Sequence, residues 1–348
     1  MDRKVKVGII GLGFMGTTHF SIYKANPKAQ IIAIADVNAD KLKGDISSVV
    51  GNIGGGDNSK PLDLSGIKTY KDAMDLINDP EVDLVDICVP LYLHKKYATA
   101  ALEINKNVLC EKPLAANSSE AMEILNASEK SKGLIMTGMC VRFWPEYRHA
   151  YELINSGKAG KVISATLKRL SPNIDGNSWE NWFMKSALSG GAIYDLHLHD
   201  TDAVRYLFGM PENVTSFGVK GVRSDNGIDH VMTRYDFGNG SLITAEGGWD
   251  AAKGTPFEMS FQIVCEKMTI RLSETGYKVI HEDGNVEDPK PADPALPTGW
   301  HVEIDYMLDC VKNGVKPEKY TTLRETIEAI KIVEAEMKSI ETSSTVKL

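Results

Sequence analysis

The chain has 348 residues, of which 43% are hydrophobic and 25% are charged, a composition typical of globular domains. This length allows two domains with separate cores. The net charge of −8 argues against a nucleic-acid-binding surface, and no segment has the roughly 20 consecutive apolar residues of a membrane span.

The start of the chain and its cysteines indicate a protein of the cytoplasm. Basic residues precede an apolar stretch at the N-terminus, but glycines interrupt that stretch, so we interpret it as a first strand and not as a signal peptide. The five cysteines are odd in number, and no two form a C-x-x-C pair. We therefore expect free thiols in a reducing compartment.

A glycine-rich turn stands between a predicted strand and a predicted helix near the N-terminus. The strand is Val5–Ile10, the turn Gly11–Gly16 reads G-L-G-F-M-G, and the helix covers Thr17–Lys24. A second apolar run, Ile31–Ala35, ends at Asp36. In this context the first glycine permits a tight turn, the second lets a pyrophosphate approach, and the third lets helix and strand pack closely. The pattern predicts a dinucleotide-binding domain.

Asp36 also bears on the choice of dinucleotide. A carboxylate at the end of the second strand accepts hydrogen bonds from the ribose hydroxyls and repels a 2′-phosphate. Neither Val37 nor Asn38 supplies an arginine for that phosphate, and we place Lys41 and Lys43 on a following helix. The sequence therefore favours NAD over NADP.

Residues 1–140 read as alternating strands and helices, which predicts a doubly wound parallel sheet. A glycine-rich loop at residues 51–65 interrupts the alternation, and we interpret it as a surface loop in preference to an oligomer contact. The further strands and helices expected here are Val82–Val89, Tyr97–Asn105, Val108–Cys110, Ser119–Lys132 and Leu134–Met139.

Residues 141–348 predict an α+β domain with an open, largely antiparallel sheet. Helices are expected over 147–156, 192–208, 302–312 and 323–339. Strands are expected over 162–170, 214–222, 230–237, 242–246, 259–264 and 268–272, with a hairpin at Asn239-Gly240.

Two segments carry residues suited to chemistry. Glu111-Lys112-Pro113 follows a strand, at the edge where open α/β sheets bind ligands. The tripeptide is equally compatible with a catalytic lysine and with a surface ion pair of Glu111. Further on, Asp195 and His199 are four residues apart on a predicted helix, an arrangement typical of a general base oriented by a carboxylate.

We expect no metal at the second segment. His197 and His199 are two residues apart, so on a helix they point in nearly opposite directions. We interpret His197 as a residue that packs in the core or supports the site residues without touching the ligand.

The tryptophans allow two interpretations. Flat aromatic faces suit sugar rings, so Trp179 and Trp182 are equally compatible with a pocket wall and with the core. We assign Trp249 to packing.

Together these segments resemble the Gfo/Idh/MocA family of oxidoreductases, which includes inositol dehydrogenases. The resemblance covers essentially the whole chain. It rests on Gly11–Gly16, Val89-Pro90 with His94, Glu111-Lys112-Pro113, Arg142-Phe143, and Gly190-Gly191 with Asp195, His199 and Asp202.

The resemblance implies a Rossmann domain followed by a domain whose open sheet forms a homodimer or homotetramer. It implies that Lys112 is the catalytic lysine, Asp195 its polar partner and His199 the acid/base, with a cis bond between Lys112 and Pro113. It places Arg142, Trp182 and Phe183 along the nicotinamide and substrate pocket. The cofactor-binding residues expected are Gly11, Gly13, Phe14, Met15, Gly16, Asp36, Val89, Pro90, His94, Glu111, Lys112 and Arg142, and the substrate-binding residues are Lys112, Arg142, Trp182, Asp195 and His199.

The chain departs from the family pattern at two places. Leu91 stands where the family often has an asparagine after the proline, which removes one polar cofactor contact. The loop at residues 51–65 is also longer than usual in the family.

Our hypothesis is an NAD-dependent dehydrogenase that acts on a secondary hydroxyl of a sugar, sugar derivative or cyclitol. One alternative is an enzyme that retains NAD and uses it transiently to oxidise a glycoside for elimination. Another is a regulator that binds NAD and a sugar without turnover. The presence of both Lys112 and His199 ranks the regulator last.

Overall fold

The computed structural model describes residues 3–51, 60–289, 293 and 295–348. Contacts group the chain into two units. The first comprises Met1–Met139, Gly176–Glu180 and Trp300–Ile327, and the second comprises Cys140–Asp175, Asn181–Gly299 and Glu328–Leu348.

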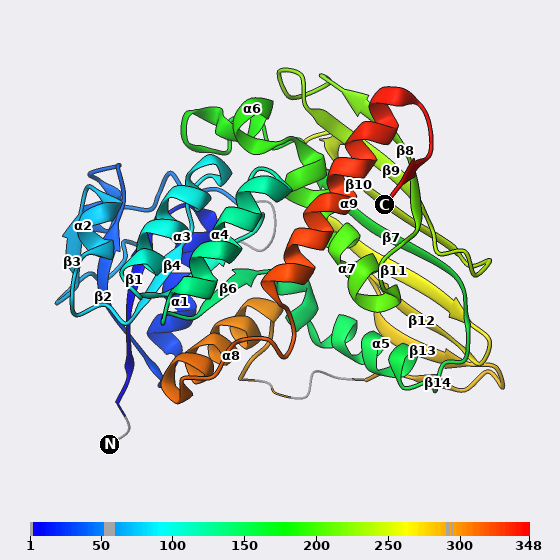
Figure 1. Cartoon of the computed structure of the whole chain (residues 1–348), viewed down its shortest axis with the longest axis horizontal. Helices are drawn as coiled ribbons and strands as arrows, with labels where there is room; N and C mark the ends of the chain where they lie inside the picture. Colours follow the sequence, from blue (N-terminus) through cyan, green and yellow to red (C-terminus); the bar gives the residue numbers. More distant parts are fainter. Residues whose placement is uncertain (1–2, 52–59, 290–292, 294) are drawn as a thin grey trace. The chain divides into compact units, whose positions relative to one another are not determined.

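The first unit contains a parallel sheet (Figure 1). Its strands are β1 (Val5–Ile10), β2 (Ala29–Ala35), β3 (Lys68–Tyr70), β4 (Leu84–Ile87), β5 (Asn107–Glu111) and β6 (Ile135–Gly138). Its longer helices are α1 (Phe14–Ala25), α2 (Ala73–Ile77), α3 (His94–Glu103), α4 (Ser118–Lys130) and α8 (Gly299–Asn313). Within the described residues the strand order is β3-β2-β1-β4-β5-β6, the order of a dinucleotide-binding sheet.

The apolar runs of the sequence form the centre of this sheet. Strands β1, β2, β4 and β5 are buried almost throughout, as in parallel sheets covered on both faces. The helix expected to carry Lys41 and Lys43 is reduced to a single 3-10 turn, η1 (Lys41–Lys43), which ends at Gly44 with φ +95°. Residues 52–59 of the predicted surface loop lie outside the described residues.

A late segment of the chain belongs to the first unit. Lys28, before β2, forms ion pairs with Asp305 and Asp309 of α8 at 2.9 and 2.8 Å. Sequence patterns do not show that a late segment packs against an early one, because they describe only neighbours along the chain. The division into domains 1–140 and 141–348 stays a prediction, and the contacts add residues 300–327 to the unit that contains β1–β6.

The second unit contains a mixed, mostly antiparallel sheet. Its strands are β7 (Val162–Pro172), β8 (Asn213–Lys220), β9 (Ile228–Asp236), β10 (Leu242–Ala251), β11 (Glu258–Cys265), β12 (Met268–Ser273), β13 (Gly276–His281), β14 (Val286–Glu287) and β15 (Val346–Lys347). Among the described strands the order is β14-β13-β12-β11-β7-β10-β9-β8-β15, and β7 and β10 pair in parallel. The predicted fold class is confirmed in both units.

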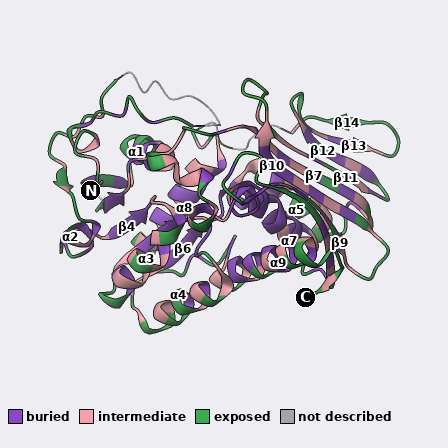
Figure 2. Cartoon of the chain, turned by 90° about the horizontal axis from the view of Figure 1, so that it is seen from above, coloured by how far each residue is buried: buried purple, intermediate pink, exposed green. Residues whose placement is uncertain are grey.

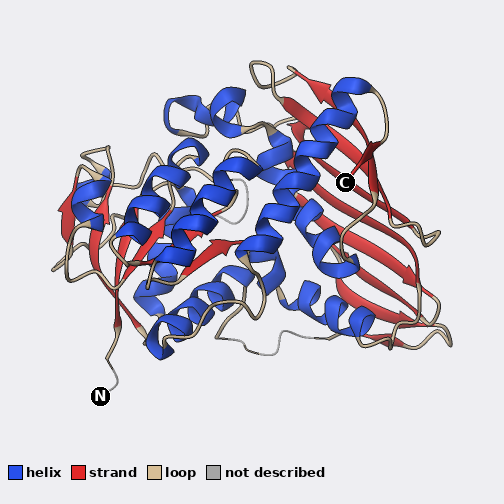
Figure 3. Ribbon diagram, in the orientation of Figure 1, coloured by secondary structure: helices blue, strands red, loops and turns tan. Residues whose placement is uncertain are grey.

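Helices cover one face of this second sheet (Figure 3). They include α5 (Pro145–Asn155), α7 (Leu198–Phe208) and α9 (Leu323–Thr342), and Figure 2 shows buried residues where they meet the sheet. Shorter helical segments are η2 (Leu91–Leu93) in the first unit, and η3 (Cys140–Phe143), η4 (Trp179–Met184), α6 (Ser186–Ser189) and η5 (Ile193–His197).

The opposite face of the second sheet presents side chains outward. Burial alternates along β9, where Val231, Thr233 and Tyr235 are buried while Met232 is 52% exposed. Phe217 of β8 pairs directly with Met232 and is 71% exposed. This alternation is typical of a sheet with one covered face.

A buried ion pair joins the sheet to α7. Arg169 of β7 donates from Nε to Asp200 Oδ2 at 2.9 Å, and both side chains are almost completely buried. Removing one partner of a buried pair leaves the other charge without compensation, which costs about 3–5 kcal/mol.

We expect Arg169→Leu to lower the free energy of unfolding by about 3–5 kcal/mol in urea titrations followed by fluorescence. The matched control is Arg324→Leu, which removes an exposed pair with Glu129 and costs at most about 1 kcal/mol. Equal, small losses for the two variants would contradict the structural importance of the Arg169–Asp200 pair.

Candidate functional site

Two glycines of the glycine-rich turn leave no space for a side chain, whereas the third does. Gly11 has φ +89°, and a Cβ there would lie 2.5 Å from the Cys88 carbonyl oxygen. A Cβ on Gly16 would lie 1.8 Å from the Gly11 oxygen. A Cβ on Gly13 would meet no atom within 4 Å. Gly13 therefore leaves open space above the turn, as a bound pyrophosphate needs.

The N-terminus of α1 is suited to an anion. Gly13 is its N-cap, so no side chain accepts from the first main-chain N–H groups, and the first turn contains no acidic residue. Such N–H groups and the positive end of the helix dipole attract phosphate. Phe14 and Met15 are half-buried in this turn, and their contact with the cofactor stays a prediction.

Asp36 is held beside the glycine turn. Its Oδ2 accepts a hydrogen bond from the Leu12 main-chain N–H at 2.7 Å, and its Oδ1 accepts from Asn38 at 2.8 Å. The half-buried carboxylate retains lone pairs for ribose hydroxyls. Together with the open position at Gly13, this geometry fits a dinucleotide.

Lys112 is presented at the carboxyl end of β5. Its side chain is half-exposed, whereas Glu111 and Pro113 on either side are buried. The Lys112–Pro113 peptide bond is cis, as the family resemblance implied. Glu111 Oε2 accepts a hydrogen bond from the Lys112 main-chain N–H at 3.1 Å, so the main chain is held at the lysine itself.

His94 holds the same segment from its other end. Its Nδ1 lies 2.6 Å from the Pro113 oxygen and its Nε2 lies 2.8 Å from the Val89 oxygen. Burial lowers the pKa of His94, against the effect of these two carbonyls. The side chain thus connects the segment after β4 to the segment after β5.

Four residues that were predicted to bind the cofactor take part in these internal contacts or lie beside them. His94 is buried, with both ring nitrogens occupied by main-chain oxygens, and Glu111 turns its carboxylate inward. Val89 and Pro90 are half-buried beside them. Cofactor binding by these four residues stays a prediction. Leu91, where the family often has asparagine, is buried.

Asp195 and His199 lie at the start of the predicted helix, but the helix begins with a wider turn. Residues Ile193–His197 form the π-helix η5, and α7 follows from Leu198. Within Gly191–Asp200, Asp195 is the one residue that is half-buried and not fully buried. Short π segments recur at functional sites, where they change the direction of side chains within a helix.

His197 is a packing residue, as expected. It is completely buried, and its Nε2 lies 3.3 Å from the Tyr235 hydroxyl and 3.4 Å from Glu336 Oε2. Among the described residues, neither His197 nor His199 belongs to a cluster of metal-ligand type. The sequence did not identify Tyr235 and Glu336 as partners of His197. The available signal for Glu336 was its position as a glutamate on the inner face of the C-terminal helix.

Arg142 belongs to the second unit, and its side chain is bound there. Its Nε and one terminal nitrogen bind the two carboxylate oxygens of Asp202 at 2.8 and 2.6 Å, and its side chain has no exposed surface. A fully buried guanidinium needs such a carboxylate, which the motif interpretation did not consider. Contact of Arg142 with cofactor or substrate stays a prediction.

The aromatic residues form a short stack within the second unit. Trp182 stacks on Phe183 at 4.2 Å between ring centroids, and Phe183 meets the Trp249 edge at 6.3 Å. Trp249 is completely buried and donates to Asp229 at 2.6 Å, which confirms its packing role. Trp179 is 50% exposed and Trp182 half-buried, so substrate contact by Trp182 stays a prediction.

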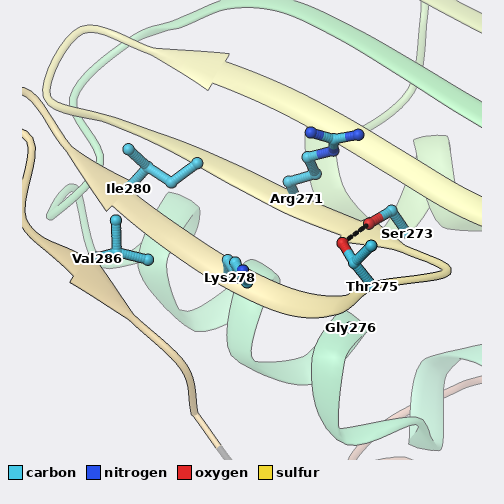
Figure 4. A pocket seen from close by; sticks show the side chains of 7 residues that line it. All are labelled: Arg271, Ser273, Thr275, Gly276, Lys278, Ile280 and Val286. Atoms are coloured by element: carbon cyan, nitrogen blue, oxygen red, sulfur yellow. Dashed lines mark hydrogen bonds between the residues drawn. The ribbon is translucent and has the colours of Figure 1, made fainter.

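A separate shallow pocket lies on β12, β13 and β14 and contains none of the predicted site residues. Figure 4 shows its lining, in which Ser273 and Thr275 hydroxyls lie 2.9 Å apart. The lining residues are Arg271, Ser273, Thr275, Gly276, Lys278, Ile280 and Val286.

The glycine turn yields a test with a matched pair of variants. Gly13→Ala adds a methyl group where the fold leaves space, so we expect stability to change by less than about 1 kcal/mol while NAD affinity falls. Gly16→Ala adds the same group against the Gly11 oxygen, so we expect a loss of stability. Thermal unfolding and NAD titration measure both. Unchanged NAD affinity in Gly13→Ala would contradict a ligand at this turn.

Comparison with known proteins identifies the family. The profile of the oxidoreductase family with an NAD-binding Rossmann fold, Gfo/Idh/MocA, matches residues 5–139, and that of the Gfo/Idh/MocA C-terminal domain matches residues 147–271. No helix among the described residues is long and apolar enough to cross a membrane.

Individual relatives are more distant. A myo-inositol 2-dehydrogenase from Thermotoga maritima is 30% identical over 208 residues, which cover 59% of this chain and 55% of that enzyme. A levoglucosan dehydrogenase from Pseudarthrobacter phenanthrenivorans is 29% identical over 273 residues, which cover 70% of this chain and 67% of that enzyme.

Solved structures show the same fold over the full length. A levoglucosan dehydrogenase in complex with NADH and levoglucosan has a TM-score of 0.83 at 22% identity, covering 99% of each chain. Because the two profiles cover most of the sequence and the observed sheets have the same architecture, the chain belongs to the Gfo/Idh/MocA family of oxidoreductases and contains its NAD-binding Rossmann domain.

Proposed function

We propose that the protein is an NAD-dependent dehydrogenase of a secondary hydroxyl on a sugar, sugar derivative or cyclitol. The observation that carries the proposal is Lys112, a half-exposed lysine whose main chain is fixed at the ligand-binding edge of a dinucleotide-binding sheet. The relatives named as inositol and levoglucosan dehydrogenases support this substrate class.

Bound NAD supplies the acceptor for the hydride of the alcohol carbon. We propose that Lys112 donates a hydrogen bond to the substrate oxygen and stabilises the negative charge that develops there. His199 accepts the hydroxyl proton, and Asp195 orients these groups through its charge. The reaction then leaves a ketone in the substrate.

Asp36 supports NAD as the cofactor in preference to NADP. Its carboxylate is fixed by two main-chain N–H groups, so it cannot turn away from a 2′-phosphate without losing both hydrogen bonds. Lys43 of η1 pairs with Asp40 at 2.9 Å and is 74% exposed.

The outward face of the second sheet supports a homo-oligomer. Phe217 and Met232 are directly paired on this face, and two further apolar residues, Val219 of β8 and Leu242 of β10, are half or more exposed. Such exposed apolar side chains on a sheet favour association with a second copy. We propose that this face forms a homodimer, alone or within a tetramer.

The enzymatic proposal is tested by NADH formation with NAD, and separately with NADP, across inositols, aldoses and simple glycosides. We expect Lys112→Met to lower kcat about 10²–10⁴-fold while NAD affinity is retained, because the lysine acts on the substrate oxygen. Lys95→Met, which removes a half-exposed lysine paired with Glu123, is the matched control and should leave kcat unchanged.

Near-normal turnover in Lys112→Met would rule out the proposed role of this lysine. Absence of net NADH formation with every substrate, from protein that keeps NAD through gel filtration, would instead favour transient oxidation with a retained cofactor.

The oligomer proposal predicts that the double variant Phe217→Glu and Met232→Glu has a lower molar mass than wild type in light scattering. The two added carboxylates carry like charges, which cannot be buried between two copies without compensation. Lys316→Glu, at an exposed residue of the first unit, should leave the mass unchanged. An unchanged mass in the double variant would exclude this face as the interface.

A further inference from the structure

A cluster of ionisable side chains is buried in the first unit beneath Lys112. His19 of α1 lies between Asp86 of β4, with Nδ1 to Oδ2 at 2.8 Å, and Glu111 of β5, with Nε2 to Oε1 at 3.2 Å. Glu303 of α8 brings a third carboxylate, and one of its oxygens, a ring nitrogen of His19 and a Glu111 oxygen lie within 4.8 Å of one another. His19, Asp86 and Glu303 have no exposed surface, and Glu111 is 6% exposed.

These groups cannot all be ionised. Asp86 uses both oxygens, since it accepts from His19 and, at 3.4 Å, from the Cys88 thiol. Neither oxygen of Glu303 has a hydrogen-bond partner among the described residues. Three buried carboxylates beside one imidazole exceed the charge that the imidazole can balance, and an uncompensated buried carboxylate is neutralised by a proton.

The electrostatic surroundings indicate where the protons reside. Burial raises the pKa of Glu303, and the neighbouring Glu111 and Asp86 raise it further, against the effect of His19. Burial opposes a charge on His19, but the attraction and hydrogen bond to Asp86 oppose this effect, and the pKa of His19 is raised.

The remaining groups of the cluster are neutral. Burial, together with Asp86, raises the pKa of the Cys88 thiol, although His19 lowers it. Burial and Asp86 likewise raise the pKa of Tyr23 on α1. Burial and the neighbouring carboxyl groups thus favour a proton on Glu303, and Asp86 favours the protonated form of His19.

Glu111 connects this cluster to Lys112. Its Oε1 faces His19 and Glu303, while its Oε2 accepts the hydrogen bond from the Lys112 main chain. A proton on Glu303 removes the repulsion between the two glutamates, and Nε2 of His19 lies 3.2 Å from Oε1 of Glu111. The conformation of Glu111 thus depends on both neighbours.

We propose that His19 and Glu303 are positioning residues for Lys112: they hold Glu111 in the conformation that fixes the lysine main chain, and Glu303 does so while it carries a proton. This proposal rests on the proposed role of Lys112. The residues concerned are His19 on α1, Glu111 on β5 and Glu303 on α8, and none of them touches the substrate in the proposed reaction.

Three variants test the role of Glu303 through turnover. Glu303→Gln keeps the shape of the side chain and remains neutral at every pH. We therefore expect kcat close to wild type at neutral pH, without the decline that we expect for wild type at alkaline pH. Glu303→Leu replaces the carboxyl group beside Glu111 with a branched apolar side chain of different shape, so we expect kcat to fall on the order of tenfold to a hundredfold with NAD affinity retained. Asp309→Asn, half-exposed on the same helix, controls for an acid-to-amide change and should behave as wild type.

A kcat for Glu303→Leu equal to wild type, or an alkaline decline that persists unchanged in Glu303→Gln, would overturn the proposal. If wild type and all variants show no turnover, the proposed function fails, and the cluster is then judged by proton linkage alone.

Proton linkage provides a measurement that is independent of activity. Between the ordinary glutamate pKa of about 4.3 and the raised value, the folded protein holds more protons than the unfolded chain, so wild-type Tm falls as pH rises. His19, with its raised pKa, contributes in the same direction above pH of about 6.5. Glu303→Gln should flatten the decline, and its Tm should rise relative to wild type with increasing pH.

Parallel Tm curves for wild type and Glu303→Gln would show that Glu303 is not protonated and would overturn the proposal. A metal ion bound stoichiometrically to purified protein, and lost in Glu303→Leu, would overturn it as well, because a cation would then neutralise the carboxylates in place of the proton.

Discussion

The second unit depends on one constraint: the polar and charged side chains that α7 buries must each have a partner. The helix turns Asp200, Thr201 and Asp202 inward, where an amphipathic helix ordinarily carries apolar residues. Each finds a partner on a different element: Arg169 on β7, Glu336 on α9 and Arg142 on η3. Because an unpaired buried charge is costly, the helix cannot rotate or shift along its axis without breaking several of these contacts. The position of His199 follows from those contacts.

The first unit fixes its reactive lysine by a comparable arrangement. Lys112 lies between two buried side chains, Glu111 and His94, and the contacts of both are with main-chain atoms of this segment. Main-chain anchoring restricts where the lysine side chain begins. The two segments that His94 connects follow neighbouring parallel strands, so the position of the lysine depends directly on the sheet.

The local patterns of the sequence determined much of this fold. The apolar runs at Val5–Ile10 and Ile31–Ala35, the glycine turn and the cis Lys112–Pro113 bond were all predictable from neighbours along the chain or from the family motif. The π-helix before α7 was not, because hydrophobic periodicity does not distinguish a wide turn from an ordinary one. Strand β13 was missed for a similar reason, since a short strand after a tight turn carries little pattern. The cluster of His19 and Glu303 was beyond reach, because its members come from the two ends of the sequence and meet only in the folded chain.

The placement of α8 has a consequence for synthesis of the protein on the ribosome. The strands β1–β6 of the nucleotide-binding sheet leave the ribosome early, but Glu303, Asp305 and Asp309 are made only after strands β7–β14 of the second sheet. Until α8 emerges, His19 and Glu111 lack the acid that completes their cluster, and Lys28 lacks its two carboxylate partners. The Rossmann sheet therefore receives part of its polar interior late in synthesis. A fragment that ends at residue 140 would lack α8 and, with it, Glu303, Asp305 and Asp309.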